Sequence, residues 1–240
     1  MPGRYDKCKI KWNKIFGEHK PNLPSNGSSG NEGLDKGIQW VCEGTDTILD
    51  FGCGNGTLLF LCAFHGTKTH IGIDISEKAI ENAQELSFQI EQGKFQFIRD
   101  GVHQLQKLDD AFFDAVILSN IIDNLYPEDA QIVLNETARI LKDNGKVLVK
   151  LNPFITESQI KEWQIKIIKD NLLDDGFILW NNTTDQWKSL LEKNFNIHKF
   201  QEVYYPEHEQ YNRMFLITKN ILDDSSKPHR LCDKNINFYF

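Results

Sequence analysis

The sequence has no apolar run long enough to span a membrane and no apolar leader near its start. A membrane-spanning helix needs ~20 apolar residues, and a secretory leader needs an apolar stretch behind its basic start. Cysteine is also sparse, because the five thiols are scattered, odd in number and without a C-x-x-C pair. That pattern predicts neither a disulfide framework nor a zinc site. We therefore expect a cytoplasmic protein without membrane association and without a bound metal.

Basic stretches are scarce as well. The 240 residues carry 27 Lys and Arg against 34 Asp and Glu, a formal net charge of -7. Proteins that hold nucleic acids gain much of their affinity from Lys and Arg side chains that neutralise phosphates. The acidic balance argues against DNA as a partner, although four lysines near the start leave a local basic face open (Lys7, Lys9, Lys11 and Lys14). The length corresponds to one domain with a sizeable core.

A glycine-rich loop between an apolar strand pattern and an apolar helix pattern occupies residues 47–57. Gly52 and Gly54 let the backbone turn sharply and approach a ligand closely. A dinucleotide loop has the spacing G-x-G-x-x-G, but Thr57 stands where the third glycine belongs. Asp50 places a negative charge before the loop, where it repels a pyrophosphate and attracts an ammonium or sulfonium group. The loop therefore suits a cationic ligand better than a phosphate.

Two further predicted strands also end in an acid. Residues 69–74 end at Asp74, about 20 residues past the loop, where a carboxylate reaches ribose hydroxyls in nucleoside-binding α/β folds. Residues 95–99 are followed by Asp100. A structural turn alone does not call for acids at three successive strand ends, so we favour ligand binding. The alternatives are a helix cap for Asp74 and an ordinary Asp-Gly turn for Asp100.

These features together resemble a known family. Residues 50–56 (DFGCGNG) resemble the D-x-G-x-G-x-G signature of class I S-adenosylmethionine-dependent methyltransferases. Residues 113–120 resemble the fourth strand of that family, and residues 141–149 resemble its following helix end, turn and fifth strand. The resemblance spans residues 34–220 and implies S-adenosylmethionine as cofactor and S-adenosylhomocysteine as product.

The resemblance also implies a donor site. Asp74 would bind the ribose, and Asp100 would accept from the adenine amino group. Ile75 and Val102 would flank the adenine, although core packing explains them equally well. Cys53 is interpreted as a small loop residue, because no base accompanies it as a nucleophile would require. The predicted cofactor-binding residues are Asp50, Gly52, Cys53, Gly54, Asp74, Ile75, Asp100, Gly101 and Ser119.

The acceptor side is predicted after the fourth strand. In related enzymes this segment lies near the methyl group, and here it spans residues 119–125. The candidate catalytic residues are Asp123, which would orient an amine or accept a proton, and Asn120. Alternatively, Asp123 and Asn124 only form the turn before Pro127. The segment after the fifth strand supplies no carboxylates for a divalent metal. Further candidate pocket walls are Asn152, Trp180, Tyr204, Tyr205 and Arg213.

Strands that alternate with amphipathic helices predict an α/β fold, a doubly wound and mostly parallel sheet with helices on both faces. The resemblance makes this sheet seven-stranded. Ser76 is a predicted helix cap and Pro127 a predicted first-turn residue. Residues 196–205 and 212–219 predict a C-terminal antiparallel hairpin.

Two predictions concern the region between the fifth strand and the hairpin. Ile160, Trp163, Ile167 and Ile168 have the spacing of one helix, which makes the insertion after the sheet helical. Thr184 is expected to cap a second helix.

The predicted organisation has three parts. Residues 1–33 form an N-terminal lid segment and linker, residues 34–220 the methyltransferase domain, and residues 221–240 a mobile C-terminal tail. The alternative for the first part is a helix pinned to the domain by Trp12 and Phe16, which lie four residues apart.

The predicted reaction is an in-line displacement of the methyl group from S-adenosylmethionine onto a small-molecule acceptor. Two alternatives remain, a methyltransferase that acts on a protein or RNA and a non-catalytic module that binds S-adenosylmethionine. The acceptor atom and the oligomeric state stay open.

Overall fold

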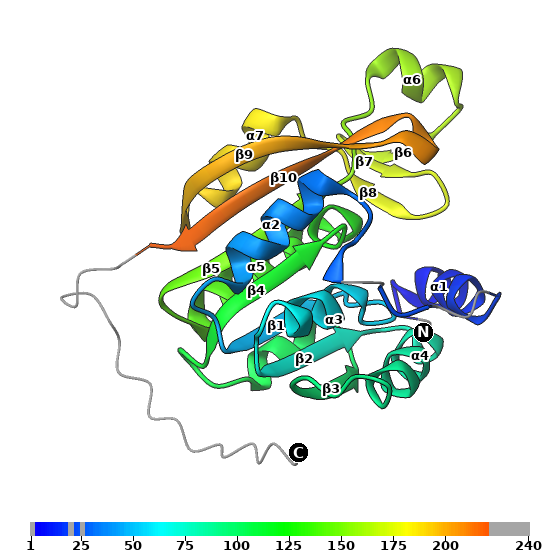
Figure 1. Cartoon of the computed structure of the whole chain (residues 1–240). Coiled ribbons are helices and arrows are strands. Elements are labelled where there is room, and N and C mark those ends of the chain that lie inside the picture. The colour runs from blue at the N-terminus through cyan, green and yellow to red at the C-terminus, as the bar shows by residue number, and fades with distance from the viewer. Residues whose placement is uncertain (1–2, 19–21, 25–26, 221–240) are drawn as a thin grey trace.

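The computed structural model of the chain describes residues 3–18, 22–24 and 27–220. Seven strands form the main sheet: β1 (Thr47–Phe51), β2 (Thr69–Asp74), β3 (Lys94–Arg99), β4 (Phe113–Ser119), β5 (Leu141–Leu151), β9 (Phe195–Tyr205) and β10 (Gln210–Lys219). Their order is β3-β2-β1-β4-β5-β10-β9, with β10 antiparallel to both neighbours and the other pairs parallel (Figure 1). The predicted seven-stranded, mostly parallel sheet is confirmed.

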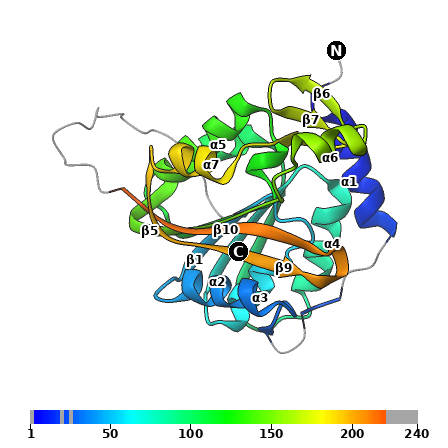
Figure 2. The ribbon, with the colours of Figure 1, turned by 90° about the horizontal axis from the view of Figure 1, so that it is seen from above.

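Helices cover both faces of this sheet, as the alternating pattern predicted (Figure 2). One face carries α2 (Glu32–Cys42), α3 (Thr57–Phe64) and α4 (Glu77–Ser87), and the other carries α5 (Pro127–Ile140) and α7 (Thr184–Leu191). Successive strand residues point to opposite faces. Ile48 and Leu49 of β1 accordingly pack into different apolar clusters, one on each face. The sheet is therefore buried on both sides.

The helix ends follow local sequence signals. The Ser76 hydroxyl accepts from the Ala79 N–H at 3.2 Å at the start of α4, and Pro127 opens α5, as predicted. The prediction for α7 was wrong by one residue, because the Thr183 hydroxyl accepts from the Gln186 N–H at 3.2 Å. Thr184 is instead the first helical residue.

The insertion after β5 differs from the prediction of a single helix. It consists of the short helix α6 (Glu157–Glu162) and a separate antiparallel sheet of β6 (Lys166–Lys169), β7 (Leu172–Asp174) and β8 (Ile178–Trp180). Gln164 has a φ of 53° and Asp170 a φ of 49°, left-handed conformations that interrupt a helix. Trp163 and Ile167 are each 56 % exposed, so their helical spacing does not reflect a buried face. The β-branched run around Ile167 forms an edge strand instead.

The C-terminal hairpin is confirmed. β9 and β10 pair in antiparallel register, and the turn between them holds a short 3-10 helix at Pro206–His208 followed by Glu209 with a φ of 49°. The predicted tail at residues 221–240 and part of the predicted linker lie outside the described residues. Within the described ranges, no helix is both long and apolar enough to cross a bilayer.

The buried imidazole of His70 makes the stability of this fold dependent on pH. His70 is fully buried in β2, where its Nε2 lies 2.6 Å from the Thr67 hydroxyl and its Nδ1 3.0 Å from the Lys94 carbonyl. Burial lowers the pKa of His70 to about 4, although the hydrogen bond to Lys94 opposes the shift. Below the unfolded-state pKa of about 6.5, the His70 imidazole binds a proton in the unfolded chain but stays neutral in the folded chain. The contribution of neutral His70 to the free energy of unfolding is therefore fully present above that pKa and is lost as the pH falls toward the folded-state pKa.

We expect the free energy of unfolding to fall by roughly 2 kcal/mol more in the wild type than in His70→Phe between about pH 7 and pH 5. Phenylalanine removes the titration and retains a ring that can stack on Phe95, which lies 4.5 Å from the imidazole between centroids. Urea unfolding at each pH measures the difference. Parallel pH profiles for the two proteins would contradict this role of His70.

Candidate active site

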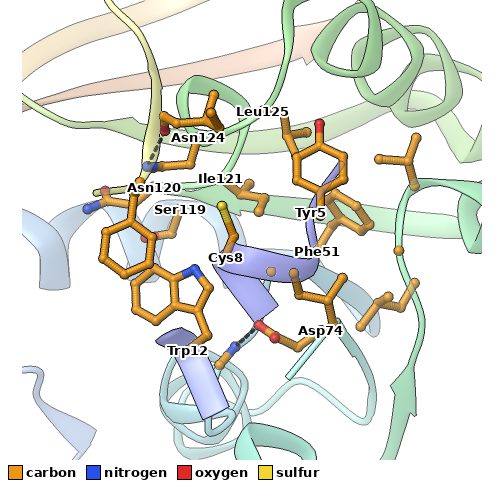
Figure 3. A pocket seen from close by; sticks show the side chains of 18 of the residues that line it. Tyr5, Cys8, Trp12, Phe51, Asp74, Ser119, Asn120, Ile121, Asn124 and Leu125 are labelled. Carbon is orange, nitrogen blue, oxygen red and sulfur yellow. Dashed lines mark hydrogen bonds between the residues drawn. The ribbon is translucent and has the colours of Figure 1, made fainter. Parts of the chain in front are cut away.

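A cavity of about 170 Å³ opens at the carboxyl ends of β1 to β4 (Figure 3). Parallel strands bring these ends to one edge of the sheet, which is where open α/β folds bind ligands. Seven of the nine residues predicted to bind the cofactor line this cavity: Gly52, Gly54, Asp74, Ile75, Asp100, Gly101 and Ser119. The structure therefore brings together residues that are spread over nearly 70 positions of the sequence.

The glycine loop forms one wall of this first cavity. Gly52 has a φ of 79° and Gly54 a φ of 53°, conformations that side chains rarely adopt. A Cβ atom on Gly52 would lie 2.8 Å from Ile121, and one on Gly54 would lie 3.0 Å from the Phe16 ring. The Gly52 N–H donates to the Ile73 carbonyl at 2.8 Å, which ties the loop to β2. Both the backbone conformation and the close packing therefore require glycine at these positions.

Asp74 holds the loop from the end of β2. Its Oδ2 accepts from the Gly54 N–H at 2.9 Å (Figure 3), and its Oδ1 accepts from the Ser76 N–H at 2.8 Å. Burial raises the pKa of Asp74 above its usual value, and these backbone hydrogen bonds oppose the shift. A carboxylate has about four acceptor positions. Asp74 therefore retains capacity for ligand hydroxyls while it fixes the loop.

The end of β3 forms the opposite wall. Asp100 accepts from the Gly101 N–H at 2.7 Å and from the Lys107 ammonium at 3.0 Å. Burial opposes ionisation of Asp100, but these hydrogen bonds outweigh it and lower the pKa of the carboxyl group. Ile75 and Val102 both line the cavity and supply apolar surface. The wall thus combines an ionised acceptor with apolar side chains.

Asp50 and Cys53 do not reach the first cavity. The Asp50 carboxyl is only 1 % exposed, and its Oδ1 has no hydrogen-bond partner among the described residues. Burial and the charge of Asp74 raise the pKa of Asp50 to about 8, although Lys150 opposes the shift. The Cys53 thiol is buried, and burial together with these two acids raises its pKa far above the usual range. That environment disfavours the thiolate, in keeping with the interpretation of Cys53 as a loop residue.

The two candidate catalytic residues have different positions. Asn120 lines the first cavity, and its amide contacts Asn152 at 3.2 Å and Asn212 at 3.3 Å. Asp123 is fully buried and does not line it. The 3-10 turn Ile122–Asn124 directs the Asp123 carboxylate to the end of β5, where its Oδ2 accepts from the Asn152 N–H at 2.7 Å. Asp123 therefore positions Asn152 and lies too deep to meet a bound molecule.

Helix α1 (Asp6–Glu18) covers the first cavity. Tyr5, Cys8, Trp12 and Phe16 recur at helical spacing and all line it. The Tyr5 hydroxyl donates to Asp129 at 2.6 Å and thereby anchors the start of the helix to α5. Near its other end, the Phe16 carbonyl accepts from the Asn82 amide at 2.8 Å. The helix is therefore attached at both ends, and its aromatic face points into the cavity.

The insertion contributes a residue that the sequence analysis missed. Phe177 lies in the turn between β7 and β8 and lines the cavity, with its ring 4.7 Å from that of Trp12 between centroids. The Asp175-Gly176 pair between two apolar runs is a hairpin signal that could have located this turn. The helical interpretation of the insertion concealed it.

A second cavity of about 810 Å³ adjoins the first. We call the residues that line both cavities the junction, and they are Trp12, Asn120, Asn124 and Phe177. The end of β5, the insertion and the C-terminal hairpin enclose the remainder. The predicted walls Asn152 and Arg213 line the second cavity, whereas Trp180, Tyr204 and Tyr205 do not. Within the described part of the chain, no three His, Cys, Asp or Glu side chains gather in the geometry of a metal site.

Comparison with known proteins gives a consistent result. A family model described as a methyltransferase domain matches residues 43–201. The ribosomal protein L11 methyltransferase of Clostridium botulinum is 25 % identical over 163 residues, which cover 66 % of this chain and 46 % of that protein. The tRNA N(3)-methylcytidine methyltransferase of Schizosaccharomyces pombe is 24 % identical over 161 residues, covering 64 % and 52 % respectively. The chain spans about half the length of these curated relatives.

A solved structure extends the similarity over nearly the whole fold. The 1,6-didemethyltoxoflavin-N1-methyltransferase of Burkholderia thailandensis, solved with its acceptor and S-adenosylhomocysteine, superposes with a TM-score of 0.66. The match covers 92 % of each chain at 12 % sequence identity. Identity at this level establishes the fold alone.

Proposed function

This chain belongs to the class I methyltransferase family, and on that premise we propose that it transfers a methyl group from S-adenosylmethionine to a small-molecule acceptor. The observation that supports the proposal is the junction, where the cavity lined by the glycine loop, Asp74 and Asp100 meets a larger cavity. A transferase needs two such sites with one shared boundary. The donor occupies the first cavity, and the acceptor enters the second.

In this proposal the residues along the first cavity contact successive parts of the donor. Asp100 accepts from the adenine amino group between the apolar side chains of Ile75 and Val102. Asp74 accepts from the ribose hydroxyls with the lone pairs that its backbone bonds leave free. The glycine loop and Ser119 then face the methionine end, where the close backbone leaves room for the ligand.

The junction holds the methyl group. The rings of Trp12 and Phe177 lie beside it, and aromatic faces attract a cation such as the sulfonium. The Asn120 and Asn124 amides offer hydrogen bonds to the incoming nucleophile. Methyl transfer from an activated sulfonium mainly requires that the nucleophile is held about 3 to 3.5 Å from the methyl carbon, and such positioning supplies up to roughly 7–11 kcal/mol. No general base is needed unless the acceptor must lose a proton.

Helix α1 acts as the lid of the donor site in this proposal. Its aromatic face closes the first cavity and separates the reacting atoms from water. The lid has no residue buried in the core of the sheet, so opening it leaves the domain folded. Its anchors are hydrogen bonds and ion pairs, such as Arg4 to Asp129 at 2.8 Å.

The second cavity favours a small acceptor. It is within the volume range of small-molecule sites, and side chains from several separate elements line it. Its acids Asp175, Glu202 and Glu209 repel a nucleic-acid backbone. A compact organic molecule with an apolar body matches this lining better than a phosphate-rich polymer.

Calorimetric titration with S-adenosylmethionine and S-adenosylhomocysteine tests the donor assignment, with NAD as control. We expect about micromolar binding of both sulfur ligands and no binding of NAD, because Thr57 stands where a dinucleotide loop has its third glycine. An acceptor screen of small amines, thiols and hydroxylated acids would follow. Folded protein that binds neither sulfur ligand would refute the proposed activity.

A further inference from the structure

Arg213 is a buried cation that lines the second cavity without a carboxylate partner. The residue is 3 % exposed. Its Nε donates to the Asn152 carbonyl at 3.0 Å, and its Nη1 donates to the Asn182 carbonyl at 2.8 Å. Among the described residues, no carboxylate oxygen lies within 4.0 Å of its guanidinium group. The hydrogen-bond partners of this charged guanidinium group are therefore neutral carbonyl groups.

Arg139 shows how the same chain treats a comparable arginine. Its guanidinium also donates to two backbone carbonyls, those of Leu105 and Leu108, each at 2.8 Å. It pairs in addition with Glu136 at 2.6 Å and with Asp110. The carbonyl-bound arginine far from the cavities is thus neutralised by two acids, whereas Arg213 has none in contact.

The acids nearest to Arg213 do not replace such a partner. Asp123 is linked to it only through Asn152, whose N–H donates to Asp123 and whose carbonyl accepts from Arg213. Asp123 also faces the buried Lys150, which Asp50 faces as well, so Asp123 does not interact with Arg213 alone. Burial lowers the pKa of Arg213, and the charges of Asp123 and Glu202 offset this only in part. Arg213 is therefore a buried cation near these acids but without a carboxylate in direct contact.

The guanidinium group retains donors for a ligand. Arginine has five N–H groups, of which two are bonded here. The Nη2 atom has no hydrogen-bond partner in the described part of the chain. It is not one of the fully buried polar atoms that lack a partner. It therefore has access to the cavity. Buried charges are normally paired, and a paired guanidinium binds planar oxygen anions especially well.

We propose that Arg213 binds a carboxylate group of the methyl acceptor in the second cavity. This inference rests on the proposed function and adds the chemical class of the acceptor. The rim acids Asp175 and Glu202 disfavour a polyanion, so a single carboxylate fits better than a nucleic-acid backbone. The aromatic side chains of Phe154, Trp163 and Tyr211 line the same cavity and contact the apolar body of the molecule.

The test measures binding of matched acids and amides to protein loaded with S-adenosylhomocysteine. The probes are benzoate and 4-aminobenzoate, each compared with its primary amide by calorimetry up to about 10 mM. We expect the wild type to prefer at least one acid over its amide by about 10-fold or more, because a charge-assisted pair is lost in the amide. Arg213→Met should abolish the preference, and Arg139→Met should retain it.

Arg213→Lys keeps the charge with a single donor group and should show a reduced preference for the acid over its amide. This variant provides a second test of the proposal if Arg213→Met does not fold. Equal binding of acid and amide by the wild type, no binding of either acid, or a preference that survives in Arg213→Met would overturn the proposal. Affinity for S-adenosylhomocysteine separates the two levels of inference. If that ligand binds and the acid preference is absent, only the role of Arg213 fails; if that ligand does not bind, the proposed function fails.

Discussion

Replacing Asp74 with alanine is expected to weaken S-adenosylhomocysteine binding by about 100-fold or more, which is nearly 3 kcal/mol. The side chain has two effects that are lost together. It accepts ribose hydroxyls under the proposed function, and it fixes the glycine loop through the Gly54 N–H at 2.9 Å. Calorimetric titration of the folded variant measures the loss.

Asp114→Ala is the matched control for this prediction. Asp114 also accepts from two backbone N–H groups, those of Asp46 at 3.1 Å and Thr47 at 2.9 Å. It lies at the opposite end of the sheet and does not line either cavity. We expect Asp114→Ala to lower stability while leaving the affinity for S-adenosylhomocysteine unchanged. A folded Asp74→Ala protein with wild-type affinity would remove Asp74 from the donor site.

Replacing Trp12 with alanine is expected to weaken S-adenosylhomocysteine binding by roughly 30- to 100-fold, or about 2 to 3 kcal/mol. The indole packs on Phe16 at 5.7 Å and on Phe177 at 4.7 Å between ring centroids. Its loss opens the junction to water and loosens the contact between α1 and the insertion. The free energy of unfolding should change by less than about 1 kcal/mol, because α1 has no buried residue.

This substitution distinguishes a lid from a helix that merely rests on the domain. A pinned structural helix would lose stability and retain ligand affinity, which is the reverse of the result expected here. Trp40→Ala is the control, because Trp40 is also partly buried and stacks on His198 at 5.6 Å, away from both cavities. It should leave the affinity for S-adenosylhomocysteine unchanged.

The elements that could be predicted are those whose structure follows from residues within one short segment of the sequence. The strand, loop and helix around Gly52 follow from an apolar run, positive φ angles and an all-apolar helix within a short segment. Asp74 and Asp100 could be placed at strand ends because alternation and turn residues mark where each strand stops. The prediction of a helix in the insertion was wrong because the local spacing of apolar residues there is misleading. The isoleucine and tryptophan residues of the insertion have helical spacing. The left-handed backbone conformations of Gln164 and Asp170 interrupt a helix, and that spacing gives no sign of them.

The positions of the acceptor-side residues could not be predicted from local signals. Sequence spacing could not tell whether Asp123 faces the cavity or Asn152, because the choice depends on a turn that packs against the end of β5. Phe177 reaches the junction only because the insertion folds back over α1. The environment of Arg213 depends on the tertiary structure, because the two carbonyls that accept from its guanidinium belong to Asn152 and Asn182, 61 and 31 positions away.

The sequence by itself therefore determined the family, the mostly parallel sheet with its C-terminal hairpin, and the acids at the ends of three strands, because parallel strands place their carboxyl ends together. Only the tertiary structure decided which side chains enter the cavities. That choice is made by packing between distant segments, such as the Tyr5 hydroxyl on Asp129 and the ring of Trp12 on Phe177. Contacts of this kind leave no periodic signal in the sequence, since each one depends on how two separately formed elements meet.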